Sequence, residues 1–288
     1  MSINIQQKSL CPNVIVVNSS YEILSSFGYL WRLNEQKLIS QVTSWVGVGN
    51  SAYLVALLAA GIDCVKIYED MLELDFSLFM CLSKSWNVDT YIQQVTNQLN
   101  LRLNQKFGFV PTLKELYLRT HKRLVLLAFN INTNKLEYIY DTTHPNISVV
   151  QAVICSMGVY TICPQVKLDS ENLIYTSGAI VKPYPIDTFI RDPTALIMGI
   201  RSSSHPSFAL YGEKIDGDRL IHRLQQEWLI NQTISHCDGM NNVKHVNILG
   251  HQKINNDMPK LALITLGWQF GTQINKVSFP NLHPENQE

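Results

Sequence analysis

Charged residues are scarce in this chain of 288 residues: Asp, Glu, Lys and Arg together make up 16% of it, against roughly 25% in an average globular protein. The 23 basic side chains equal the 23 acidic ones, so the formal net charge is zero. Binding to a phosphate backbone is driven by clustered positive charge, which disfavours a nucleic-acid partner. The surface must then be rich in uncharged Asn and Gln, as expected of a protein that packs against other proteins.

Long apolar runs are also missing. No stretch reaches the roughly 18 to 20 apolar residues that a membrane-spanning helix needs, and residues 1–10 lack the apolar centre of a secretory signal. We therefore expect a cytoplasmic or otherwise intracellular chain without a transmembrane segment, which could be a component of a larger particle.

The sequence has no cysteine pair at metal-binding spacing. Its six cysteines are dispersed without a C-x-x-C pair, and free cysteine in an apolar run behaves as a small hydrophobe, so we expect reduced thiols. His236, Cys237, Asp238, His245 and His251 carry metal-ligating groups, but their spacing matches no standard zinc pattern. We expect neither a metal nor a cofactor.

Short β-rich apolar runs alternate with segments of helical periodicity. The runs predict strands at residues 14–17, 42–48, 124–130, 135–140, 166–168, 173–175 and 194–200. Helical spacing predicts helices at residues 22–33, 52–60, 83–107, from Thr112 onward and at 148–157, where Thr112 with Glu115 has the form of a capping box. The alternation predicts an α/β fold of three layers with a mainly parallel central sheet.

The character of the chain changes beyond residue 202. Residues 217–231 predict an amphipathic helix, residues 232–260 are polar and Asn-rich, and residues 261–270 predict a strand or a helix. The polar segment is either an extension packed on the main body or a variable loop. We divide the chain into an α/β domain over residues 1–212 and a C-terminal extension over residues 213–288 packed on it.

Several motifs occur in a fixed order along the predicted domain. They are Thr143-His-Pro-Asn146, Gln151-Ala-Val-Ile-Cys-Ser-Met157, Cys163-Pro-Gln-Val166, Tyr175-Thr-Ser-Gly-Ala179 and Lys182-Pro-Tyr-Pro-Ile-Asp187. In this order they resemble the patatin-like phospholipase family over roughly residues 12–212. Viral and bacterial members carry similar motifs, and the Asn- and Ile-rich composition would suit a large DNA virus or an intracellular bacterium.

The resemblance implies a patatin-like fold and lipid acyl hydrolysis by three parts. A glycine-rich turn supplies N–H groups to an oxyanion, a G-x-S-x-G elbow holds the serine nucleophile, and an aspartate in D-G-G/A acts as base. Here Asn18, Ser19 and Ser20 stand where the glycine-rich turn would be, and Ser177 replaces the aspartate. A serine does not accept a proton near neutral pH as a carboxylate does.

The elbow admits two alignments. In one, Gly47 comes first and Gly49 takes the position of the nucleophile. In the other, Ser51 is the nucleophile and Tyr53 replaces the closing glycine, where its bulk should crowd the helix against the strand. The elbow departs from the family pattern in either alignment.

Other candidates have simpler interpretations. Asp141 and Asp187 are potential substitute bases, but Asp187 is expected to cap or turn the chain after Pro185. Ser156 is expected to bond the backbone of its own helix. The basic run at residues 119–123 is either a solvated helix end or an anion or membrane-surface site.

These departures predict an inactive member of the family. Loss of a nucleophile or base typically lowers the rate by some 10⁴- to 10⁶-fold, so we expect no catalytic residue and a pseudoenzyme kept as a structural, assembly or regulatory interaction protein. Its partner would be another protein or further copies of itself. One alternative is a lipid acyl hydrolase with Ser51 as nucleophile, and another is a non-hydrolytic lipid-binding module.

Overall fold

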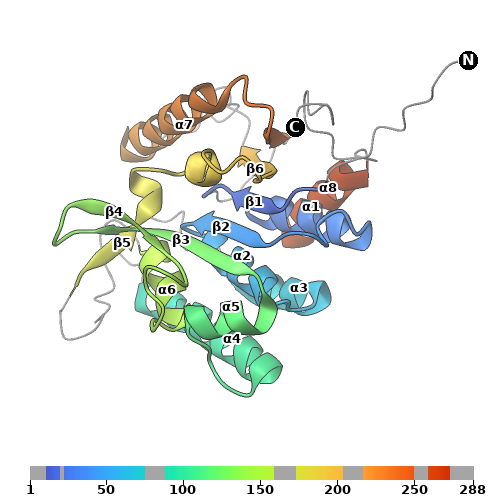
Figure 1. Ribbon diagram of the computed structural model, residues 1–288, viewed down its shortest axis with the longest axis vertical. Helices are drawn as coiled ribbons and strands as arrows, with labels where there is room; N and C mark the ends of the chain where they lie inside the picture. Colours follow the sequence, from blue (N-terminus) through green and yellow to red (C-terminus); the bar gives the residue numbers. More distant parts are fainter. Residues whose placement is uncertain are drawn as a thin grey trace, which may run out of the picture.

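The computed structural model describes residues 11–19, 23–74, 88–158, 173–203, 217–249 and 259–272 (Figure 1). Seven strands of these segments form one sheet in the order β4-β3-β2-β1-β6-β7, with β5 also paired to β3. Their bounds are β1 Val14–Val17, β2 Ser44–Val48, β3 Arg123–Asn130, β4 Lys135–Ile139, β5 Tyr175–Ser177, β6 Ile197–Ser203 and β7 Val243–Leu249. All neighbours are parallel except β4 and β5, which run antiparallel to β3. The predicted mainly parallel sheet is confirmed.

Helices cover both faces of the sheet. Their bounds are α1 Ile23–Glu35, α2 Ser51–Ala59, α3 Cys64–Glu73, α4 Val88–Phe107, α5 Leu113–Thr120, α6 Val149–Met157, α7 Gly217–Cys237 and α8 Lys260–Thr272. One apolar core joins the sheet to every helix except α7. A second core, on the other face, joins it to α7 and to residues 179–195. Figure 1 shows the resulting layers, with α7 on one side of the sheet and α2 to α6 on the other.

The sequence explains the central elements directly. The four residues of β1 are all buried, as expected of an interior parallel strand. Every residue of α2 is buried, and Gly61, at φ +67°, follows its end. Thr112 with Glu115 and Ser148 with Gln151 form capping boxes at the starts of α5 and α6.

Helices α1 and α8 pack unusually closely. A Cβ atom added to Gly28 of α1 would overlap the carbonyl oxygen of Ile264, and one added to Gly267 of α8 would overlap that of Ser25. Because glycine lacks a side chain, the two helix backbones approach where larger residues would hold them apart.

Several element bounds differ from the sequence prediction. Strand β6 begins three residues late, because Asn13 Oδ1 accepts a hydrogen bond from the Leu196 N–H at 2.7 Å in the preceding turn. Strand β5 begins at Tyr175, at the end of the predicted segment. Helix α3, capped by Asp63, was not predicted. The predicted strand at residues 166–168 lies outside the described residues.

The C-terminal part contributes to the central sheet. Helix α7 continues to Cys237, and the polar segment after it contains β7, which pairs in parallel with β6 along seven residues. Residues 261–270 lie in a helix, α8. The part predicted to be an extension therefore adds an edge strand and a packed helix to the main body. Within the segments that the structure covers, no helix combines the length and the hydropathy needed to cross a bilayer.

Candidate active site

A sharp strand-to-helix turn joins β2 to α2. Strand β2 ends at Val48, Gly49 adopts the left-handed conformation at φ +61°, and α2 begins at Ser51. The Gly49 N–H donates a hydrogen bond to the Ser156 carbonyl oxygen at 3.1 Å. This is the geometry of a nucleophile elbow, in which the residue at the turn projects toward the end of the sheet. The residue in the left-handed conformation at this turn is therefore Gly49, and Ser51 already lies in the helix.

Ser51 lies beneath the elbow rather than on it. Its side chain is 0% exposed. The Ser51 Oγ accepts a hydrogen bond from the Val48 N–H at 2.9 Å and lies 2.9 Å from the carbonyl oxygens of Val17 and Val48, to which it can donate. The N-cap residue of α2 is Asn50, and Ser51 is the first residue of the helix. The Ser51 hydroxyl thus ties β1, β2 and α2 together and is closed to a substrate.

The segment after β1 lies across the elbow. Asn18 is buried, and its side chain bonds the backbone of Ser202 on β6 through Oδ1 at 3.2 Å and Nδ2 at 3.4 Å. Ser19 is half-buried, and its N–H donates to the Pro183 carbonyl oxygen at 2.8 Å. A Cβ atom added to Gly49 would overlap the Ser19 Oγ and lie 3.2 Å from the Ser19 Cβ. Ser20 lies outside the described residues.

The segment that resembles the family's aspartate motif lies against the same turn. The Ala179 Cβ would be 3.5 Å from a Cβ atom on Gly49. Ser177 is 8% exposed, and its Oγ accepts a hydrogen bond from the Ala179 N–H at 3.2 Å. Gln226 of α7, which sequence reasoning missed, donates from Nε2 to the Ala179 carbonyl oxygen at 2.9 Å. The chain therefore brings together the two regions that the resemblance pairs.

Ser156 supports the elbow from below. Its Oγ donates to the Leu127 carbonyl oxygen of β3 at 2.7 Å, so the prediction that it bonds its own helix backbone is wrong. Helix α6 packs against β3, and the strand carbonyl lies within reach of this buried hydroxyl. Together with the bond from Gly49, this fixes the turn against both α6 and β3.

The prediction for Tyr53 is also wrong. Its side chain does not crowd the strand but is buried in the helical layer, where its hydroxyl donates to Asp70 Oδ2 at 3.2 Å. Asp70 in turn accepts hydrogen bonds from Arg102. Burial, then the negative charge of Asp70, raises the pKa of Tyr53.

The two candidate substitute bases are held in ion pairs. Asp141 Oδ1 accepts from Arg123 Nε at 2.8 Å, and Asp187 Oδ2 accepts from Lys182 Nζ at 2.8 Å. Burial lowers the pKa of Lys182, but its bonds to Asp187 and Tyr138 outweigh that effect and raise it. Among the described residues, these carboxylates bond Arg123, Thr142 and Lys182 and none of the elbow residues.

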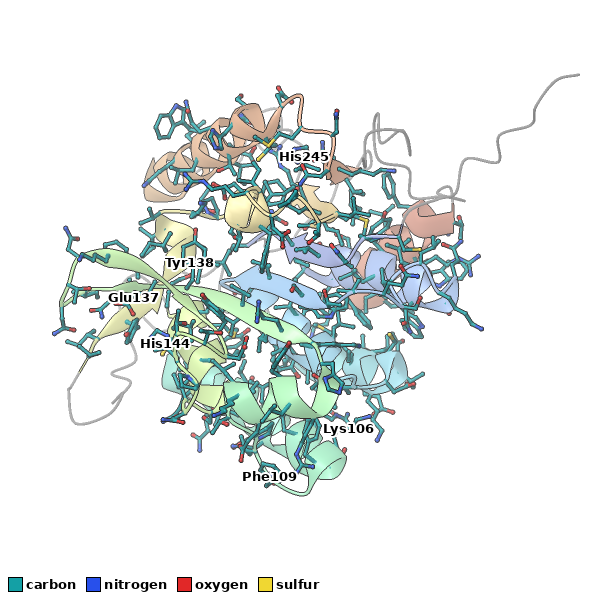
Figure 2. The ribbon with its side chains drawn as sticks, in the orientation of Figure 1. Lys106, Phe109, Glu137, Tyr138, His144 and His245 are labelled. Carbon is teal, nitrogen blue, oxygen red and sulfur yellow. The ribbon has the colours of Figure 1, made fainter. Side chains whose placement is uncertain are left out.

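A separate cavity of about 450 Å³ lies beside β4 and residues 188–189. Glu137, Tyr138 and His144 line it and lie close together in Figure 2, with His144 Nε2 3.7 Å from Glu137 Oε2. Glu137 Oε2 also accepts from the Tyr175 hydroxyl at 2.8 Å. Gly49 and Ser19 are not among its lining residues.

The candidate metal ligands do not gather. Among the residues described, no three His, Cys, Asp or Glu side chains are placed to hold a metal ion. His245 Nδ1 lies 3.2 Å from the Tyr184 hydroxyl, and Figure 2 places His245 far from His144. Burial raises the pKa of the Cys237 thiol to about 11. His251 falls outside the described segments.

The basic run lies at the other end of the sheet from the elbow, where β3 begins. The Arg119 guanidinium lies 4.8 Å from the centre of the Phe109 ring. Figure 2 shows Phe109 and Lys106, which stands at the end of α4, at this end of the molecule. Burial, then the neighbouring charge of Lys106, lowers the pKa of Lys122. Arg123 is paired with Asp141.

The chain is similar in sequence to a viral protein and in structure to a bacterial one. The chain is 26% identical over 172 residues, 56% of its length, to a protein of Invertebrate iridescent virus 6 called "Probable lipid hydrolase 463L". The structure is similar to that of VipD from Legionella pneumophila, with a TM-score of 0.50 and 12% identity over 92% of this chain. The chain spans 58% of the length of the viral relative and 66% of that of VipD. The likeness to VipD supports the fold alone.

A family model of patatin-like phospholipases matches residues 22–190, which is more than half of the chain and includes the elbow and the segment around Ser177. With the viral relative named as a lipid hydrolase, this match contradicts the prediction of a catalytically inactive scaffold, assembly or regulatory protein. That prediction treated departures from three motifs as loss of activity, although a fold can place equivalent groups at other positions. The chain belongs to the patatin-like phospholipase family.

Proposed function

We propose that this protein is a lipid acyl hydrolase that cleaves the ester bond of a membrane or micellar lipid. The observation that carries the proposal is the left-handed elbow at Gly49, packed against Ala179, in a member of a lipid-hydrolysing family. Helix α2 begins two residues after Gly49. The positive end of its dipole therefore lies at the turn, where it stabilises the negative charge that develops on a carbonyl oxygen.

The helix attached to the site also carries exposed apolar side chains. Gln226 of α7 bonds the Ala179 carbonyl oxygen, while Leu224 and Trp228 on the same helix are 60% and 61% exposed. Tryptophan combines a large apolar body with a polar N–H and favours the boundary between lipid and water. These two residues support an aggregated lipid as substrate.

Hydrolysis of phospholipid vesicles tests the function. The purified chain is incubated with phosphatidylcholine and phosphatidylglycerol vesicles, and released fatty acid is measured by mass spectrometry. Ala179→Leu should lower release by about tenfold or more, because the larger side chain fills the space over the turn. Val181→Leu, on the exposed end of the same segment, should leave it unchanged. Failure of the wild-type chain to release fatty acid from vesicles or detergent micelles would overturn the proposal.

The role of α7 is tested with two forms of ester. A double variant with Leu224→Ser and Trp228→Ser should hydrolyse vesicles severalfold more slowly. It should turn over a soluble p-nitrophenyl ester at the wild-type rate, because only the vesicle offers a lipid surface. Gln225→Ser, an exposed polar position between them, is the matched control. Equal losses on both esters would argue against surface contact by α7.

A further inference from the structure

The elbow presents no side chain of its own. Gly49 occupies the turn at φ +61°, a conformation that costs little for glycine and more for other residues. In an esterase elbow the residue at this point carries the attacking hydroxyl or thiol. If the chain hydrolyses esters through a covalent intermediate, another residue must bring the nucleophilic atom to the same place.

The hydroxyl of Ser19 already occupies that place. A Cβ atom on Gly49 would overlap the Ser19 Oγ, so this oxygen fills the volume in which a side chain at the turn would begin. The backbone that leads into Ser19 is held in place, since the Asn18 side chain is bonded to Ser202 and the Ser19 N–H is bonded to Pro183.

The other serine hydroxyls around the elbow already make hydrogen bonds to the backbone. The Ser51 Oγ bonds Val48 and Val17, and the Ser156 Oγ bonds Leu127, both with side chains fully buried. The Ser177 Oγ accepts from the Ala179 N–H. Within the described residues, the Ser19 Oγ has no hydrogen-bond partner, and Ser19 is half-buried rather than enclosed. Of these four serines, Ser19 is the one that is not buried.

We propose that Ser19 is the nucleophile of the hydrolase and replaces the side chain that Gly49 lacks; this inference rests on the proposed function. The Ser19 Oγ attacks the ester carbonyl carbon, the bond to the alcohol oxygen breaks, and the hydroxyl proton ends on the departing alcohol, carried by water. A second water then splits the acyl–Oγ bond, releases the fatty acid and restores the hydroxyl.

A fluorophosphonate probe tests the assignment without knowledge of the preferred lipid. Wild-type protein should gain one adduct, located by peptide mass spectrometry at Ser19. Ser19→Ala should lose the adduct and lower ester turnover by about 10³-fold or more. It keeps the N–H bonded to Pro183, so its urea unfolding midpoint should match that of wild type. Ser40→Ala, an exposed serine in the turn after α1, is the control.

A paired exchange gives a second, independent test. The double variant Ser19→Gly with Gly49→Ser removes the overlapping hydroxyl and supplies one from the turn itself, so labelling should return and map to the peptide containing position 49. Ser19→Gly alone should remain unlabelled. Labelling of Ser19→Gly, or failure of the double variant to label while it remains folded, would count against a nucleophile at this point.

The outcomes separate the two proposals. Lipid hydrolysis that survives Ser19→Ala overturns the assignment of Ser19 and leaves the hydrolase function standing. An adduct on Ser19 without release of fatty acid supports a reactive serine and overturns the lipid substrate. Absence of both the adduct and fatty acid overturns both proposals.

Discussion

Asp70 of α3 and Arg102 of α4 form a bidentate ion pair in the helical layer beneath the elbow. The Arg102 Nη2 lies 2.7 Å from Asp70 Oδ1, and its Nε lies 3.0 Å from both carboxylate oxygens. The Asp70 side chain is 0% exposed and that of Arg102 is 11% exposed. Since Tyr53 of α2 also donates to Asp70, one carboxylate links three helices. Burial raises the pKa of Asp70, although Arg102 and Tyr53 oppose this effect.

Arg102→Ala should destabilise the fold by about 3 to 5 kcal/mol at neutral pH, because it leaves a buried carboxylate without its partner. The pKa of Asp70 is higher in the folded state than its reference value of 3.8 for the unfolded chain. Such a group stabilises the fold at pH values below 3.8, and this stability is lost as pH rises through the folded-state pKa. Removing Arg102 takes away an influence that lowers this pKa, so the loss in the variant should shrink as pH falls from neutral toward 3.8. Urea unfolding at several pH values measures this.

The control for this prediction is Gln105→Ala, which removes only an exposed partner 3.4 Å from Arg102 Nη1. Its free energy of unfolding should remain within about 0.5 kcal/mol of wild type. A loss in Arg102→Ala of less than about 1 kcal/mol, or one that is equal at neutral pH and near pH 3.8, would contradict the interpretation of Asp70 as a buried charge.

Gly28→Ala should loosen the contact between α1 and α8. The added methyl would overlap the Ile264 carbonyl oxygen, which belongs to a helix backbone and cannot rotate away. We expect a loss of about 1 to 3 kcal/mol, the usual cost of overpacking. Thr265→Ala changes an exposed position of α8 by a similar volume and should have little effect. Equal thermal unfolding midpoints for the two variants would show that the helices separate readily.

The sequence predicted much of the fold because its strongest patterns are local. The buried run at residues 14–17 and the capping boxes at Thr112 and Ser148 specify their elements within a few neighbouring residues. Strand β7 was missed because its apolar residues, Val243, Val246, Ile248 and Leu249, do not alternate regularly and stand in a polar context, and its pairing partner β6 lies over 40 residues earlier. Such a strand is defined by tertiary pairing more than by propensity.

The candidate site was predicted only in part for a similar reason. Motif alignment brought Gly49 and Ser177 into consideration, and the structure places their segments together. The alignment could not decide between Gly49 and Ser51, because only the backbone conformation shows which residue occupies the left-handed turn. The approach of Ser19 to Gly49 joins positions 30 residues apart, and no spacing rule in one sequence reveals it.

Ser51→Ala should weaken the fold without affecting a reactive serine. It removes the acceptor for the Val48 N–H and the donor to the Val17 carbonyl, so two buried backbone groups lose a partner. We expect a loss of about 1 to 3 kcal/mol in urea unfolding, with fluorophosphonate labelling retained below the transition. Ser40→Ala, whose hydroxyl is exposed, should leave both readouts unchanged. Loss of labelling in folded Ser51→Ala would return Ser51 to the role of nucleophile.

His245 should make stability depend on pH in the mildly acidic range. It lies on β7, bonded through Nδ1 to the Tyr184 hydroxyl, with Nε2 buried and unpartnered among the described residues. Burial lowers its pKa below 6.5, while Asp238 opposes and Arg201 adds to that shift. Because the pKa of His245 is lower in the folded state than the unfolded value of 6.5, this residue stabilises the fold above pH 6.5. That stability is lost as pH falls through the folded-state pKa.

The measurement is the urea unfolding midpoint between pH 8 and pH 5. Wild type should hold its midpoint down to about pH 6.5 and lose stability below it, because folding then has to exclude a proton that the unfolded imidazole binds. His245→Phe keeps a ring in the same space and should flatten this part of the profile, at the cost of an unpaired Tyr184 hydroxyl at every pH. His236→Phe, at an exposed position near the end of α7, should keep the wild-type slope. A slope that persists in His245→Phe would assign the acid sensitivity to other groups.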